Sequence, residues 1–172
     1  EWHGKPIIRH VAETLTSTKV HNILVVIGFE SQKIKTALRG LDIEFITNHK
    51  WRAGQGSSVK AAIDRIDEDA GGTIILLGDQ PQVERSLIDS LIDEHSVTLA
   101  KIIVPFYKNR RANPVLFDRS SFPLLSNLSG DKGGRSIFGK IPLHKLQWND
   151  ASITLDVDKP EDIHKIDALF HN

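Results

Sequence analysis

Two aspartates stand where a carboxylate can hold a metal ion. Asp79 directly follows the apolar run Thr73–Gly78, and Asp158 stands just before Pro160. Mg²⁺ prefers a few carboxylates together with substrate phosphate oxygens, so the two side chains suit a metal-bound phosphate ligand. An aspartate at such a place also commonly caps a turn or a helix start. Considered singly, each aspartate could be either a metal ligand or a cap of a turn or helix.

A second stretch contains groups that suit a phosphate or a ribose. Asn48, Gly54 and Ser58 lie in a segment that links an apolar run to a run with helical spacing. Glycines allow close backbone approach, and serines and free amides at a helix start can receive phosphate or ribose oxygens. The third glycine of the dinucleotide-binding fingerprint is absent. An ordinary serine cap explains the stretch equally well.

Several cations stand in two polar loops of a chain whose net charge is zero. Lys plus Arg is 22 and Asp plus Glu is 22. Arg110 and Arg111 lie in the first loop, and Lys132 and Arg135 lie in the second, which is rich in glycine. Arginine can clamp an anion with its planar fork and lysine with its point charge. The alternative is a solvated surface turn, which we prefer for Arg110.

Other kinds of chemistry find no support in the sequence. Zero net charge argues against nucleic acid and anionic membranes as partners. The absence of cysteine excludes disulfides, thiolate zinc sites and cysteine nucleophiles. The eight histidines show no zinc-ligand spacing, and no nucleophile elbow occurs. Gly134–Lys140 has the spacing of a phosphate loop, but Ile141 occupies the place of the required Ser or Thr.

The elements that position these residues follow from the hydrophobic period. Short apolar runs alternate with helical spacing, which predicts a largely parallel sheet covered on both faces. The strands predicted in the first half are Asn22–Gly28, Asp42–Thr47 and Thr73–Gly78. Thr73–Gly78 is apolar and β-branched, so we expect it to be central. Ligands of such sheets bind at the carboxyl ends of the strands, where Asp79 and Asn48 stand.

The last third has a weaker pattern. Four further strands are predicted there: Lys101–Pro105, Asn113–Phe117, Leu143–Trp148 and Ser152–Asp156. Pro160 and the acidic residues after it predict a helix start, because proline suits the first turn and acids offset the helix dipole.

Length and composition indicate one domain over residues 1–172, since domains typically have about 100–200 residues. No apolar run approaches the roughly 20 residues that span a bilayer and no signal peptide opens the chain, so we expect a cytoplasmic protein. The chain has no methionine, and Glu1–Pro6 reads like the middle of a connection. We therefore do not expect Glu1 to be the encoded start.

Six segments in order resemble the successive motifs of molybdenum cofactor cytidylyltransferases, and they cover nearly the whole chain. These segments are Gly4–His10, Asn48–Ser58, Leu77–Pro81, Arg111–Phe117, Gly130–Arg135 and Asp156–Asp162. The resemblance implies a Rossmann-like nucleotidyltransferase domain of the α/β class, with a mostly parallel sheet in a three-layer α/β/α arrangement. It also implies transfer of CMP from CTP to the molybdenum (molybdopterin) cofactor with release of pyrophosphate, and a recipient molybdoenzyme as partner.

The resemblance also assigns roles to residues. The catalytic metal ligands for Mg²⁺ would be Asp79 and Asp158. The residues near the nucleotide would be Asn48, Gly54, Ser58 and Asp79. The residues that face the pterin cofactor would be Arg111, Asn113, Lys132 and Arg135. Because the protein acts by positioning phosphates and neutralising charge, no side-chain nucleophile is expected.

The chain departs from the family pattern in one large respect. Family members begin with a strand and a loop of the form L-A-A-G-x-S-x-R-M-G-x-x-K, and this sequence starts after it. Without that strand the sheet would lack a central member. Smaller departures occur at Gln55, Val59, Ala112 and Gly134.

Three alternative functions stay open. The chain resembles, less closely, a guanylyltransferase that uses GTP on the same cofactor, or a sugar nucleotidyltransferase. A protein of another class, an inactive cofactor-binding or chaperone module, is the third.

Overall fold

The computed structural model describes residues 1–157 and 159–170 of the 172-residue chain. Its first part alternates helices and strands: α1 (Ile7–Thr16), β1 (Leu24–Ile27), α2 (Ser31–Ala37), β2 (Glu44–Thr47) and α3 (Gln55–Ile63). β1 and β2 are parallel, with Ile27 opposite Thr47, so their carboxyl ends lie side by side. The predicted strands Asn22–Gly28 and Asp42–Thr47 are confirmed, with shorter bounds.

The remaining strands form a second, mixed sheet. They are β3 (Gly72–Ile75), β4 (Ile102–Tyr107), β5 (Arg110–Arg111), β6 (Val115–Asp118) and β7 (His144–Gln147). β4 forms an antiparallel hairpin with β5 and β6, β3 pairs antiparallel with β6, and β7 runs parallel to β4. The hairpin is interrupted at residues 112–114, where the Asn113–Pro114 peptide bond is cis.

The other helices are α4 (Arg85–Thr98), α5 (Phe122–Ser126) and α6 (Pro160–Phe170). Short 3-10 helices occur at Trp51–Ala53, Arg119–Ser121, Gly134–Ile137 and Ala151–Thr154. The predicted helix start at Pro160 is confirmed.

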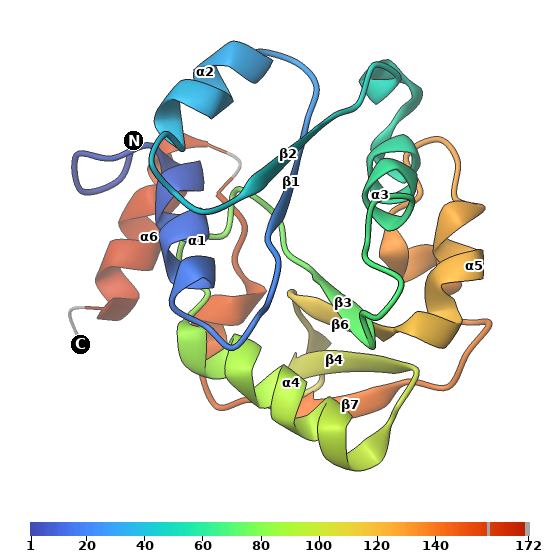
Figure 1. Cartoon of the computed structure of the whole chain (residues 1–172). Coiled ribbons are helices and arrows are strands. Elements are labelled where there is room, and N and C mark those ends of the chain that lie inside the picture. Colours follow the sequence, from blue (N-terminus) through green and yellow to red (C-terminus); the bar gives the residue numbers. More distant parts are fainter. Residues whose placement is uncertain (158, 171–172) are drawn as a thin grey trace.

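Side chains of β4 and β6 alternate between two packed faces. Val104 and Phe117 pack in a cluster with residues of α3 and α5. Ile103 and Leu116 pack instead with Leu91 of α4. In Figure 1, α3 and α5 accordingly lie on one side of the sheet and α4 lies on the other. This alternation produces the three layers, and the α/β class is confirmed.

The central strand of the second sheet is β4, whereas Thr73–Gly78 was predicted to be central. Ile102, Ile103 and Val104 have 0% of their surface exposed, because β4 is paired on both edges and covered on both faces. β3 ends at Ile75 and all four of its residues are half-buried. Within residues 1–157 and 159–170, β1 pairs with β2 and β3 with β6, and the two sheets are not joined.

The predicted strand Ser152–Asp156 is wrong. Residues Ala151–Thr154 form a 3-10 helix instead, and Ser152 is buried at its start. The Asp150 side chain accepts a hydrogen bond from the Ser152 backbone N–H at 2.8 Å, which caps this turn and draws the chain away from an extended conformation.

In the described part of the chain, no helix has the length and apolar character that crossing a membrane requires.

Candidate functional site

Asn48 joins the carboxyl ends of β1 and β2 to the start of α3. Its backbone N–H donates to the Ile27 carbonyl at 2.8 Å. Its side-chain Nδ2 donates to the hydroxyls of Ser57 and Ser58 at 2.9 and 3.0 Å, and its Oδ1 accepts from the Lys50 N–H at 2.8 Å. Asn48 is 6% exposed. The structure therefore brings together Asn48 and Ser58, two of the residues that were predicted to serve the nucleotide.

Gly54 packs directly against the loop that carries Lys132. Gly54 has φ +95°, and a Cβ at this position would lie 2.5 Å from the Gly130 carbonyl oxygen and 2.6 Å from Oδ1 of Asp131. The Gly56 N–H donates to the Gly130 carbonyl at 2.9 Å. The predicted nucleotide loop and the predicted cation loop are thus neighbours, although they are far apart in sequence.

These contacts correct one expectation about the start of α3. Its free amides were expected to receive phosphate or ribose oxygens. The Gly56 N–H is instead bonded to Gly130, and the Ser57 N–H donates to the Gly54 carbonyl at 3.1 Å. The first turn of α3 is therefore used in part to hold the loop around residue 130.

The four residues predicted to face the pterin lie on two segments, residues 111–113 and 132–135, that are separated in sequence by β6 and α5. Arg111 is exposed on β5, and its guanidinium lies 5.7 Å from the centre of the Phe138 ring. The Phe138 N–H donates to the Arg135 carbonyl at 3.2 Å, so Arg111 and Arg135 belong to adjoining segments. Lys132 and Arg135 are exposed, whereas Asn113 is buried beside the cis peptide bond. Only the three cations of the four present their side chains to solvent.

Asp79 is half-buried and lies in the loop after β3. This loop is hydrogen-bonded to residues 152–157, which are distant in sequence. Its carbonyl accepts a hydrogen bond from the Val157 N–H at 3.2 Å. The Gln80 side chain donates to Asp156 Oδ1 at 2.5 Å. The Gln82 side chain donates to the Leu155 carbonyl at 2.6 Å and also to that of Ser152. The backbone of residue 157 is therefore in direct contact with that of Asp79. Asp158, the next residue, lies outside the described residues.

Asp79 suits a metal ion only where a phosphate ligand supplies further oxygens. Across the described ranges, no group of three or more His, Cys, Asp or Glu side chains is placed to hold a metal ion by itself. Mg²⁺ typically binds one or two carboxylates plus substrate phosphates and waters, so Asp79 needs few protein partners for such a site.

Sequence reasoning missed the structural roles of Gln80 and Gln82. Both are buried, with 2% and 1% of their surfaces exposed, and their amides hold the segment that leads to residue 157. Gln80 was noticed only as part of a turn. Nothing in the local sequence marks Gln82 as buried, because its partners lie about 70 residues further along the chain.

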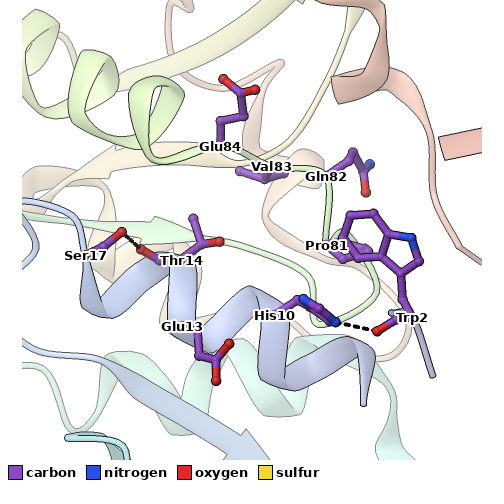
Figure 2. Close-up of a pocket in the computed structure, with 9 residues that line it drawn as sticks. All are labelled: Trp2, His10, Glu13, Thr14, Ser17, Pro81, Gln82, Val83 and Glu84. Atoms are coloured by element: carbon purple, nitrogen blue, oxygen red, sulfur yellow. Dashed lines mark hydrogen bonds between the residues drawn. The ribbon is translucent and has the colours of Figure 1, made fainter. Parts of the chain in front are cut away.

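A groove of about 430 Å³ lies beside this loop, on the side of α1 (Figure 2). His10 of α1 faces Pro81 and Gln82 across it, and the His10 Nε2 is hydrogen-bonded to the Trp2 carbonyl at 2.6 Å. The described residues that line the groove include none of the predicted site residues. Pro81 and Gln82, which line the groove, follow Asp79 in the same loop.

Comparison with known proteins identifies a family domain and several similar proteins. Residues 1–146 match the family model of the MobA-like NTP transferase domain. The nicotine blue oxidoreductase of Paenarthrobacter nicotinovorans is 25% identical over 174 residues, which cover 96% of this chain and 84% of that protein. The bifunctional protein GlmU of Exiguobacterium sibiricum is 30% identical over 101 residues, or 59% of this chain. The matched part spans only 22% of the GlmU length.

Solved structures share the fold over nearly the whole chain. Rv0371c of Mycobacterium tuberculosis H37Rv, in complex with manganese, superposes with a TM-score of 0.81 at 24% identity, covering 96% of this chain and 88% of that one. The molybdopterin-guanine dinucleotide biosynthesis protein A of Archaeoglobus fulgidus superposes with a TM-score of 0.72 at 16% identity, covering 99% and 88%. At these identities the likeness shows a common fold.

The contact between Gly54 and the loop around residue 130 leads to a stability prediction. Gly54→Ala adds a Cβ against backbone and a side chain, at a φ that L-residues rarely adopt. The free energy of unfolding, measured in urea, should fall by about 1–3 kcal/mol. Gly71→Ala is the matched control, because a Cβ there meets nothing within 4 Å. An equal effect of both substitutions would contradict the packing described here.

Proposed function

This chain belongs to the MobA-like NTP transferase family, and we propose that it transfers CMP from CTP to the molybdenum (molybdopterin) cofactor with release of pyrophosphate. The proposal treats residues 1–172 as one nucleotidyltransferase domain. The family match supports nucleotidyl transfer. The six ordered segments support the choice of CTP and of the molybdenum cofactor, since they resemble the cytidylyltransferase motifs.

The reaction needs no covalent intermediate on the protein. An oxygen of the cofactor's terminal phosphate forms a bond to the α-phosphorus of CTP. The bond from that phosphorus to the bridging oxygen of the β-phosphate breaks, and the electron pair leaves with pyrophosphate. The work of the protein is to align the two phosphates and to offset the charge that builds up between them.

Asp79 and Asp158 are the residues that we propose to hold Mg²⁺. When bound, the ion would neutralise part of the triphosphate charge. The proposal is supported by the hydrogen bonds that tie residues 152–157 to the Asp79–Gln82 loop, because residue 158 follows the tied segment directly. This tie is the single observation that carries the proposed function.

The other site residues bind and orient the two substrates in this proposal. Asn48, Gly54 and Ser58 adjoin the nucleoside of CTP. Arg111, Lys132 and Arg135 offer positive charge to the phosphate of the pterin cofactor, as exposed arginines and lysines do for anions. Asn113, which is buried two residues after Arg111, belongs to this set through the resemblance alone. A recipient molybdoenzyme would take the product.

Transfer of GMP from GTP to the same cofactor is the second candidate. It is favoured by the shared fold with the Archaeoglobus fulgidus protein, whose name refers to a guanine dinucleotide. Base choice depends on few hydrogen bonds, so the two candidates differ little in the chemistry that they require.

A turnover assay distinguishes these candidates. With Mg²⁺ and molybdenum cofactor, the protein should release pyrophosphate from CTP at least about tenfold faster than from GTP, which corresponds to about 1.4 kcal/mol of discrimination. The pyrophosphate released is converted to phosphate by inorganic pyrophosphatase, and the rate of phosphate formation is measured. A reaction without the cofactor is the control. Equal rates with both nucleotides would eliminate the cytidylyl assignment.

Removing one proposed metal ligand should abolish turnover without unfolding the protein. Asp79→Asn keeps the size of the side chain but removes its charge, so the rate should fall by roughly 10²–10³-fold or more. Circular dichroism and cooperative thermal unfolding should resemble those of the unaltered protein. Asp42→Asn, at an exposed position, is the matched control and should keep full activity. An active Asp79→Asn variant would remove this residue from the metal site.

A further inference from the structure

Two aromatic side chains are exposed at the rim formed by β1 and β2. Phe29, which follows β1 after Gly28, has 65% of its surface exposed, and Trp51, which follows β2, has 36%. Their ring centroids are 5.5 Å apart at an interplanar angle of 48°. Burying a side chain of this size stabilises a fold by about 1.5–3 kcal/mol, so exposed rings leave this gain unused. Because they are exposed, the two rings contribute little to the core and are accessible to a ligand.

Trp51 is held firmly in place. A Cβ on Gly28 would lie 2.5 Å from the Trp51 Cβ, so the tryptophan sits directly against the backbone at the end of β1. The Arg52 guanidinium lies over the Trp51 ring at 4.8 Å from its centre. Trp51 is thus engaged by Gly28, Arg52 and Phe29, and Phe29 is the ring that keeps most of its surface open.

The aromatic pair adjoins the proposed nucleotide residues. Trp51 lies between Asn48 and Gly54 in the same loop, and the Asn48 N–H is bonded to the last residue of β1, two positions before Phe29. Lys50 and Arg52 are exposed and add positive charge beside the rings. A planar surface next to cations and polar groups suits a ligand that combines a flat heterocycle with phosphates.

We propose that Phe29, supported by Trp51, stacks on the base of the bound nucleoside triphosphate. This inference rests on the proposed function and names a further binding residue for the same site. Stacking on an aromatic ring tolerates every base, because every base has a π-face. Phe29 accordingly raises the affinity for CTP and GTP alike, and the choice between them lies with other groups.

The test compares a nucleotide with a probe that has no base. Phe29→Ala, Phe29→Tyr and the unaltered protein are titrated calorimetrically with Mg²⁺ and CTP, then with Mg²⁺ and inorganic tripolyphosphate. Phe29→Ala should weaken CTP binding about tenfold, in line with the usual loss when a stacked ring is removed. Phe29→Tyr should keep the affinity, because it keeps the ring. Tripolyphosphate should bind all three proteins equally. Val97→Ala, which removes another exposed apolar side chain at 83% exposure, should change neither affinity.

The possible failures are distinguishable. If the unaltered protein binds CTP and Phe29→Ala binds it equally well, the stacking role is wrong and the proposed function is untouched. If Phe29→Ala loses CTP and tripolyphosphate to the same extent, the residue acts through the loop structure and stacking is again wrong. If the unaltered protein binds no nucleoside triphosphate, the proposed function fails and this inference fails with it.

Discussion

The candidate site depends on the hydrogen bonds that fasten residues 152–157 to the loop after β3. Gln82 is almost fully buried and bonds two backbone carbonyls of this segment, while the Asp79 carbonyl accepts from Val157. Each such bond contributes only about 0.5–1.5 kcal/mol net, but leaving a buried amide unpaired costs about 1–3 kcal/mol. Separating the two segments would leave buried amides without partners. This cost keeps the segments together beside Asp79, although they are distant in sequence.

A second set of contacts holds together the carboxyl ends of β1 and β2, the start of α3 and the loop around residue 130. Asn48 joins the ends of β1 and β2 to α3, and Gly54 and Gly56 let the loop around residue 130 pack onto the start of that helix. The glycines matter because a Cβ would meet backbone atoms of that loop. The proposed nucleotide residues and the cations Lys132 and Arg135 are consequently held by the same short-range packing. An anion bound there would meet polar groups that the fold has already ordered, which lowers the entropy cost of binding.

Much of the fold follows from local sequence, whereas the pairing of its strands does not. The period of apolar residues located β1 and β2, because each strand's pattern depends on neighbours in the chain. It misjudged which strand is central, since burial of β4 depends on partners on both edges. It also misread Ser152–Asp156, where capping by Asp150 outweighs an extended pattern. Asp79 and Asn48 could be proposed as site residues because polar residues at strand ends are visible in the sequence. Gln82 was not found, because its partners lie far along the chain.

The central proposal is that Asp79 and Asp158 coordinate one divalent ion together with the triphosphate. Anomalous diffraction from crystals grown with Mn²⁺ and CTP measures this directly, since it locates the ion independently of the protein atoms. The account predicts a single peak within about 2.6 Å of a carboxyl oxygen from each aspartate, the upper range for bonds between hard cations and oxygen. A peak that touches neither carboxylate, or a map with Asp158 on the far side of the molecule, would contradict it.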